Sequence, residues 1–382
     1  MATIIHVIDS LKVGGAQTHL VTMLREAVRS FDIQHRVLTL FDEGPIGDQI
    51  RQLGVPVDFA NIGPALGNRR YLAAIRVLDD YFHKHQPDIV EAHLTFSRLV
   101  GLVAARKAGV PTRIGFEHGD IYLNSRKFRI ANFLGQVFAH KIIVCSNALK
   151  EWCRQTHRIT PNRLVVMHNC VDPNHFSPAP GASWMQPPVD APIGKTRFCA
   201  IGSLGSGVNK RFDICIRAIQ IARLKGADLS LVIAGDGDQR ATLETLAQDL
   251  EITDNVHFLG VRSDVASIMA TCDGFCHSAP WEPFGIVALE AMASALPIIV
   301  PRAGGIQEIV EEGVNGITYP ALDAEALASA MIRLHQDPQL RRLLGSAGRK
   351  TVCARYSVEK YVQRLYAIYG LHPAGSTTSE AA

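Results

Sequence analysis

The run I-I-H-V-I-D at residues 4–9 is short, rich in β-branched residues and ends at an acid. A segment with helical periodicity, Ala16 to Ser30, separates it from a second such run, H-R-V-L-T-L-F at 35–41. Runs of this kind are typical of strands that are buried on both faces of a parallel sheet. A strand, a helix and another strand in this order predict a βαβ unit, and therefore an α/β fold.

The same alternation continues along the chain. Further predicted strands are D-I-V-E-A-H, R-I-G-F-E-H and K-I-I-V-C-S, and the segments with helical periodicity are Tyr71 to Gln86, Ser97 to Ala108 and Ser125 to His140. From Val171 a proline-rich stretch excludes a helix or a central strand. Strands resume near Thr196 with R-F-C-A-I-G, L-S-L-V-I-A-G, V-H-F-L-G, G-F-C-H-S and P-I-I-V-P.

The chain is thus expected to form two doubly wound, Rossmann-like domains that face each other across a cleft. The predicted bounds are 1–172 for the first domain, 173–195 for the linker and 196–355 for the second domain. A helix at about 356–371 is expected to pack back onto the first domain, and residues 372–382 are expected to be a disordered tail.

Composition excludes several classes of protein. The 382 residues are 47% hydrophobic, and Lys and Arg exceed Asp and Glu by only 39 − 36 = 3, too few to indicate nucleic-acid binding. The start lacks the pattern of a signal peptide, and no apolar run approaches the roughly 18 residues of a membrane span, so we expect a cytoplasmic protein.

Eight scattered cysteines without a C-x-x-C pair are interpreted as reduced and buried. Cys272, Cys276 and His277 lack the four well-spaced ligands of a zinc site, and no metal is predicted.

Residues that directly follow strands carry the functional hypotheses, because the carboxyl ends of parallel strands form the binding crevice. Gly14 and Gly15 open a helix whose N-terminus offers N–H groups to an anion, although a plain tight turn explains them equally well. His118 follows R-I-G-F-E, and a structural imidazole is its alternative interpretation. The loop from Gly202 to Lys210 and Arg211 suits a pyrophosphate, or is simply a solvated basic loop.

Residues 280–290, P-W-E-P-F-G-I-V-A-L-E, place Glu282 before a predicted helix and Glu290 about 10 Å farther along it. Such carboxylates are poorly placed to share a proton and better placed to hold two separate hydroxyl-bearing groups. The amides of Phe284, Gly285 and Ile286 lie between them and can face an anion. A nucleotide sugar has this order of parts. The alternative is that Glu282 caps the helix and Glu290 faces solvent.

This stretch, together with L-P-I-I-V-P-R-A-G-G-I-Q-E-I-V-E-E-G-V-N-G after it, resembles the carboxylate-x7-carboxylate region of family 4 retaining glycosyltransferases. V-G-G-A-Q-T-H-L, D-I-V-E-A-H, F-E-H-G-D, I-I-V-C-S-N-A-L-K and M-H-N-C-V-D are similar to further motifs of that family. The resemblance spans nearly the whole chain. It implies the GT-B fold, with an acceptor-binding first domain and a donor-binding second domain.

The resemblance also implies roles for individual residues. Glu282 and His118 would contact the donor sugar as catalytic residues, and Glu290 would contact the ribose. The other implied donor-binding residues are Gly15, Gly202, Lys210, Arg211, Gly235, Asp236, Arg262, Phe284, Gly285 and Ile286. Ser203 stands where the family usually has a phosphate-binding arginine, which Arg211 is a candidate to replace.

The implied activity is metal-independent, hexosyltransferase-type transfer from a UDP- or GDP-sugar to a hydroxyl of a glycan, a lipid-linked acceptor or a small molecule. It needs no cofactor beyond the nucleotide sugar and would serve glycan, glycolipid or envelope polysaccharide synthesis. A nucleotide-sugar-binding relative without transferase activity and a GT-B epimerase are the alternatives. The basic, phenylalanine-containing stretch Ser125 to Lys141 could lie on an anionic membrane at the inner face, or pack as an ordinary helix.

Overall fold

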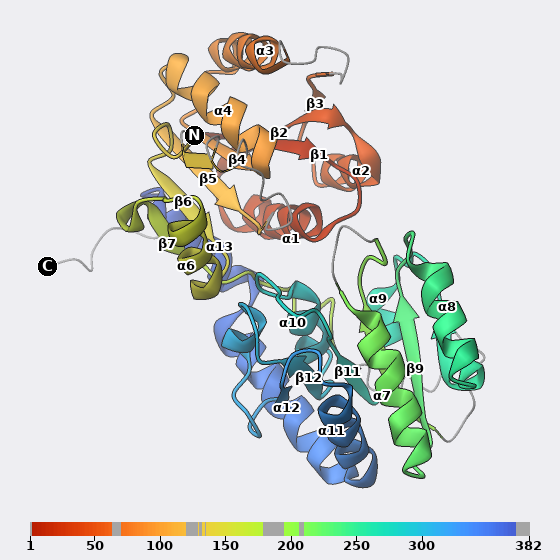
Figure 1. The fold of residues 1–382 in the computed structure, drawn as a ribbon. Coiled ribbons are helices and arrows are strands. Elements are labelled where there is room, and N and C mark those ends of the chain that lie inside the picture. Colours follow the sequence, from red (N-terminus) through yellow and green to blue (C-terminus); the bar gives the residue numbers. More distant parts are fainter. Residues whose placement is uncertain are drawn as a thin grey trace, which may run out of the picture. The chain divides into compact units, whose positions relative to one another are not determined.

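The computed structural model describes residues 2–62, 70–119, 129, 132–133, 135–178, 195–205 and 210–371. Contacts divide the chain into two compact units, Met1–Asn169 with Val358–Ala382, and Cys170–Ser357. Each unit is built on its own parallel sheet with helices around it (Figure 1). Residues 173–178, within the predicted linker, belong to the second unit by this division.

The first unit contains a seven-stranded parallel sheet in the order β3-β2-β1-β4-β5-β6-β7. Its described elements are β1 (Ala2–Ser10), α1 (Gly15–Ser30), β2 (Ile33–Asp42), α2 (Gly44–Gln52), β3 (Val57–Phe59), α3 (Arg70–His85), β4 (Ile89–His93), α4 (Thr95–Lys107), β5 (Thr112–Glu117), β6 (Lys141–Val144), α6 (Asn147–Thr156), the 3₁₀ turn η2 (Pro161–Arg163), β7 (Leu164–Val166) and α13 (Val358–Ile368). The order reverses beside β1, as in doubly wound folds.

The two faces of this sheet differ because alternate residues of a strand point to opposite sides. The face under α3 and α4 is aliphatic and includes Ile5, Val7, Leu38, Leu40 and Val90. The opposite face, which α1 and α13 cover, carries four buried titratable side chains, His6, His35, Glu91 and His93. A layer of buried titratable groups therefore lies on the face of the sheet opposite the aliphatic cluster.

The second unit contains a six-stranded parallel sheet in the order β10-β9-β8-β11-β12-β13. Its described elements are β8 (Thr196–Ile201), α7 (Phe212–Leu224), β9 (Leu229–Ala234), α8 (Arg240–Asp249), η4 (Thr253–Asn255), β10 (Val256–Phe258), α9 (Val265–Ala270), β11 (Gly274–Cys276), α10 (Ile286–Ala293), β12 (Ile298–Pro301), η5 (Ile306–Ile309), β13 (Ile317–Tyr319), α11 (Ala324–Gln336) and α12 (Pro338–Arg355). Helices α7 and α11 lie side by side over its aliphatic core (Figure 1).

The predicted α/β class with two parallel sheets is confirmed. Three short strands, β3, β7 and β13, were not among the predicted ones. Of the predicted helix from Ser125 to His140, residues 125–128, 130–131 and 134 lie outside the described residues, as does the predicted tail 372–382. Within the described part of the chain, no helix has the length and apolar character needed to cross a membrane.

Candidate active site

Glu282 lies in the loop between β11 and α10, and a second loop holds its backbone in place. The Gly305 N–H donates to the Glu282 carbonyl at 2.7 Å. Gly304 adopts a left-handed conformation (φ 68°), and a Cβ atom there would lie only 2.4 Å from the same carbonyl oxygen. Since no side chain fits between the two loops, the chain places glycine where it must approach Glu282.

Lys210, Glu282 and His277 form a group of charged and titratable side chains with little solvent exposure. Lys210 Nζ lies 2.5 Å from Glu282 Oε2, and His277 Nε2 lies 3.3 Å from the same oxygen. Ser278 Oγ donates to the Lys210 carbonyl at 2.9 Å, which ties the loop after β11 to the approach to α7. Burial alone would raise the pKa of Glu282, but Lys210 and His277 lower it to about 2. The carboxylate is therefore ionised at neutral pH, and it accepts hydrogen bonds but does not donate a proton.

Sequence analysis did not assign His277 to this site. It was considered only as a metal ligand, although it directly follows β11, the position at which functional residues were expected. It is 4% exposed, and burial lowers the pKa of its imidazole despite the neighbouring Glu282 carboxylate. Position after a strand was therefore the signal that identifies it.

Gly202 and Gly235 follow neighbouring strands and pack closely against each other. The Gly202 N–H donates to Ala234 O at 3.0 Å, and the Gly235 N–H donates to Gly260 O at 2.8 Å. At Gly235 φ is 145°, and a Cβ atom would lie 1.8 Å from Gly202 O. A Cβ atom at Gly202 would in turn lie 3.7 Å from Lys210 Cε. The structure thus brings Gly202 and Lys210 together, as expected for a donor-binding loop.

Three further charged residues predicted for donor binding are each bound by a close sequence neighbour. Arg211 Nε and Nη2 donate to the Asp213 carboxylate at 2.8 and 2.9 Å. Arg262 binds Asp264 in the same bidentate way, at 2.7 and 2.6 Å. Asp236 lies 3.1 Å from Arg240 Nη1. Arg211 does not join the Lys210–Glu282 pair here, so Ser203 has no evident arginine replacement among the described contacts.

Helix α10 carries the remaining predicted residues of this unit. Phe284 is buried, Gly285 (φ 86°) is the N-cap and Ile286 is the first helical residue, with no side chain capping the helix start. Glu290 lies on the second turn. Within the described residues its carboxylate has no recorded hydrogen bond or ion pair, and burial raises its pKa to about 7. The two glutamates therefore have opposite environments.

Gly15 and His118 belong to the first unit. Gly15 is the first residue of α1, whose first turn holds no acid and whose N-cap, Gly14, provides no side chain. A Cβ atom at Gly15 would meet nothing within 4 Å. His118 follows β5, with its Nε2 3.4 Å from His93 Nδ1 and its ring 6.3 Å from that of His19. Burial and the neighbouring histidines lower its pKa well below the usual value.

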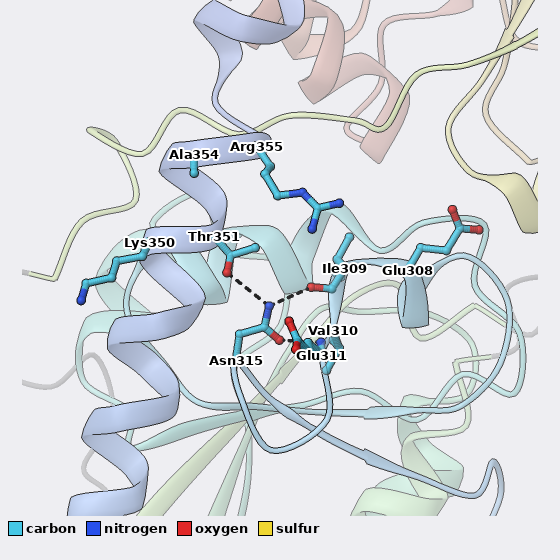
Figure 2. Close-up of a pocket in the computed structure, with 9 residues that line it drawn as sticks. All are labelled: Glu308, Ile309, Val310, Glu311, Asn315, Lys350, Thr351, Ala354 and Arg355. Carbon is cyan, nitrogen blue, oxygen red and sulfur yellow. Dashed lines mark hydrogen bonds between the residues drawn. The ribbon is translucent and has the colours of Figure 1, made fainter.

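A cavity of about 350 Å³ lies elsewhere in the second unit, between η5 and α12 (Figure 2). Asn315 links the segments that line this cavity. The Asn315 Nδ2 donates to Ile309 O and Thr351 Oγ1, both at 3.3 Å, and the Asn315 Oδ1 accepts from the Glu311 N–H at 2.8 Å. None of the predicted site residues lines this cavity. It is therefore not the predicted donor site.

Comparisons with known proteins agree with the fold and the motifs. Residues 192–351 match the family model "Glycosyl transferases group 1", and residues 13–175 match "Glycosyltransferase Family 4". The UDP-Gal:alpha-D-GlcNAc-diphosphoundecaprenol alpha-1,3-galactosyltransferase of Escherichia coli is 25% identical over 354 residues, 89% of each chain. The N-acetyl-alpha-D-glucosaminyl L-malate synthase of Bacillus anthracis is 36% identical over 142 residues, which is only 37% of each chain.

Among solved structures, that of Anabaena Alr3699/HepE in complex with UDP and glucose is similar to this chain. Its TM-score is 0.85 at 24% identity, and the match covers 96% of this chain and 99% of that one. The two family models together span most of the sequence, and the fold matches over nearly its whole length. The chain therefore belongs to the family 4 glycosyltransferases and has the GT-B fold.

Proposed function

We propose that this glycosyltransferase transfers a hexose from a UDP- or GDP-sugar to a hydroxyl acceptor, with retention of anomeric configuration and without a divalent metal. The observation that carries the proposal is the Lys210–Glu282 pair at 2.5 Å, held between two glycine-bordered loops. A lysine beside an ionised carboxylate suits the two groups that the reacting bond joins. One group becomes a phosphate anion, and the other is a sugar with hydroxyl groups.

In the proposed donor complex, Lys210 donates to the diphosphate and Glu282 accepts from the sugar hydroxyls near the reacting carbon. As the glycosidic bond breaks, negative charge develops on the β-phosphate. Lys210, the amides at the start of α10 and the N-terminus of α1 at Gly15 stabilise this charge. His118 is proposed to contact the sugar, and the first unit to bind the acceptor. The acceptor hydroxyl attacks from the face of the leaving phosphate, which helps to take its proton.

Glu290 is proposed to bind the ribose hydroxyls. A carboxyl group with a pKa of about 7 is partly protonated at neutral pH, and two hydroxyl donors favour its ionised form. Nucleotide binding should therefore release a proton. Gly235, Asp236 and Arg262 are proposed to line the nucleotide pocket, and Arg211 to lie near the diphosphate.

The acceptor is proposed to be a lipid-linked or glycan hydroxyl in envelope or polysaccharide synthesis. The Escherichia coli relative is named for a diphosphoundecaprenol-linked acceptor, which supports this choice.

The stretch Ser125–Lys141 is proposed to contact the anionic inner face of the membrane. Of its described residues, Phe133 and Val137 are exposed, at 45% and 60%. Sedimentation with anionic liposomes at low salt tests this contact, and absence of binding would exclude it.

The second candidate is a relative that binds nucleotide sugars without transferring them. Ser203 is uncharged, and its side chain accepts from the Gly205 N–H at 3.1 Å. Arg211 is bound by Asp213. Neither residue therefore supplies a second positive charge beside Lys210. This observation favours weaker stabilisation of the leaving diphosphate. A GT-B epimerase would use the same donor site without an acceptor.

A thermal-shift screen of UDP-, GDP- and ADP-sugars identifies the donor, because a ligand at 100 times its dissociation constant stabilises the protein by about 2.7 kcal/mol. The selected donor is then tested for hydrolysis and for transfer to hydroxyl acceptors, with Glu282→Ala as the inactive control. Stabilisation with turnover supports the transferase. Stabilisation without turnover across all acceptors favours the binding-only relative, and no stabilisation by any nucleotide sugar excludes both.

A further inference from the structure

A continuous series of buried side-chain contacts crosses the polar face of the first sheet. His6 Nδ1 lies 3.0 Å from Glu91 Oε2, and His6 Nε2 lies 3.0 Å from His35 Nδ1. His35 Nε2 lies 3.1 Å from Tyr366 Oη of α13. All four residues are buried, with exposures of 6% or less. One arm of the series therefore runs from Glu91 to the terminal helix.

The second arm runs from the same carboxylate toward the predicted site. His93 Nε2 lies 3.3 Å from Glu91 Oε2, and His93 Nδ1 lies 3.4 Å from His118 Nε2. The rings of His93 and His118 are stacked, with centroids 5.7 Å apart. Glu91 thus stands between two chains of imidazoles, and one of them ends at His118.

The charge on Glu91 lacks a lysine or arginine partner among the described contacts. In the same unit Glu117 is compensated differently, by Arg98 at 2.6 Å. Burial would raise the pKa of Glu91, but His6 and His93 lower it below its usual value. Burial lowers the pKa of His93 and also that of His35, the latter to about 3. The centre of the series is therefore an ionised carboxylate. His93 beside it, and His35 on the far side of His6, are neutral.

An ionised carboxylate only accepts hydrogen bonds, so it dictates where the protons lie on the histidines around it. His6 must turn its Nδ1–H toward Glu91. His93 Nε2 lies 3.3 Å from the same carboxylate without forming a hydrogen bond of good geometry, and the negative charge favours the proton on this nearer nitrogen. The Nδ1 atom of neutral His93 is then an acceptor. His118 must donate its Nε2–H to that atom, which leaves His118 Nδ1 with a free lone pair.

We propose that Glu91 is a positioning residue that acts through His93 to hold His118 in its Nε2–H form, with Nδ1 presented as an acceptor for a hydroxyl of the bound sugar. The inference rests on the proposed function, in which His118 faces the donor sugar. It assigns a role to a carboxylate and a histidine for which sequence analysis proposed none. The arm through His35 and Tyr366 points the other way and does not set the state of His118.

Several titratable or charged groups face His118. They are His19 from α1, His93 from β4 and Arg98 from α4, and each disfavours a positive charge on its ring. Tyr361 of α13 packs edge-on against His19, with ring centroids 4.8 Å apart. These groups keep His118 neutral, so its tautomer, and not its charge, is the property that Glu91 controls.

A metal ion is the competing explanation for this cluster. The ligand atoms of His6, Glu91 and His93 all lie within 4.8 Å of one another, close enough to bind one cation. The hydrogen-bonding distance of 3.0 Å between His6 and Glu91 fits direct contact instead. Metal analysis of the purified protein separates the two.

The test compares Glu91→Gln with Tyr366→Phe in the full-length protein. Both change a buried polar group of the same series, but only Glu91 leads to His118. Selective ¹⁵N-histidine labelling and NMR report the tautomer of His118. Its signal is assigned as the one that is absent in His118→Gln. We expect the wild type and Tyr366→Phe to show the Nε2–H form. Glu91→Gln should show a mixture of tautomers, because an amide donates as well as accepts.

The kinetic readout is turnover of the nucleotide sugar. Loss of one oriented hydrogen bond should lower kcat in Glu91→Gln by about tenfold with KM nearly unchanged, whereas Tyr366→Phe should stay within about twofold. An unchanged His118 tautomer in Glu91→Gln, equal effects of both variants, or a stoichiometric metal that only Glu91→Gln loses would each overturn the proposal. A wild type without turnover would overturn the proposed function, while the NMR comparison would still decide the role of Glu91.

Discussion

The raised pKa of Glu290 predicts that one carboxyl group destabilises the second unit at neutral and alkaline pH. Below its usual pKa of about 4.5, this group is protonated in both the folded and the unfolded chain and contributes nothing. As the pH rises from 4.5 to 7, the unfolded chain loses this proton first, so the folded state becomes less favourable. Above pH 7 the penalty is complete. Replacing the group by a neutral amide, Glu290→Gln, should remove it.

The size of the effect follows from the two pKa values. Raising the pKa from about 4.5 to about 7 corresponds to about 3 kcal/mol, at roughly 1.4 kcal/mol per tenfold change in proton affinity. This value is an upper bound, because the Glu290 side chain is only partly shielded from solvent. With a urea m-value of about 2 kcal/mol/M, the midpoint of unfolding would shift by up to about 1.5 M.

The assay is urea unfolding of the wild type and Glu290→Gln at several pH values between 5 and 8.5, followed by circular dichroism and tryptophan fluorescence. Trp281 lies in the same unit as Glu290 and reports on it. Glu325→Gln, which removes an exposed carboxylate bound to Lys225 at 2.8 Å, controls for loss of an acidic side chain. The variant should exceed the wild type in stability at pH 8 and approach it near pH 5. A difference that does not depend on pH would refute the reasoning.

Three further predictions concern the site. Glu282→Ala should abolish transfer but lower the affinity for UDP or GDP by less than about tenfold. Glu290→Ala should lower that affinity, measured by calorimetry for both variants, by about tenfold or more. The reverse pattern would contradict the assigned roles. Gly304→Ala and Gly313→Ala both place alanine at positive φ, which costs about 1 kcal/mol of stability. Only the Cβ atom at position 304 would lie 2.4 Å from the Glu282 carbonyl oxygen. Only Gly304→Ala should therefore lose more activity than its lower stability explains. Removing divalent metals with EDTA should leave turnover unchanged, since Lys210 and backbone amides supply the positive charge; loss of activity restored by Mg²⁺ or Mn²⁺ would disprove metal independence.

The sequence predicted the elements whose pattern is carried by many residues. The runs at 4–8 and 229–234 are buried throughout and mostly aliphatic, so their composition alone identifies them as strands. The edge strands β3, β7 and β13, which were missed, have only three residues each. Strands β10 and β11 are equally short, but the longer runs V-H-F-L-G and G-F-C-H-S around them identified them. The existence of β3, β7 and β13 depends on pairing with a neighbouring strand, a tertiary property that local pattern does not contain.

The same distinction applies to the site. Gly202 and Lys210 come from one loop and Glu282 from another, and family motifs were needed to associate the two loops. His277 lies beside these residues because β11 pairs with β8, and no local motif encodes this pairing. Arg211 was assigned from its charge and Arg262 from the family resemblance, but an aspartate two residues later holds each of them. Charge in a sequence gives no information about which nearby partner a flexible side chain takes.

The docking of α13 on the first unit has a consequence for biosynthesis. Tyr366 is fully buried there, and its ring lies 4.6 Å from that of Phe31. The ribosome must add the 188 residues from Cys170 to Ser357 before this helix exists, which takes about 10 to 40 s at roughly 5 to 20 residues per second. During that interval the surface around Phe31 and His35 on the nascent amino-terminal half stays exposed, and we expect chaperones to bind it until α13 docks.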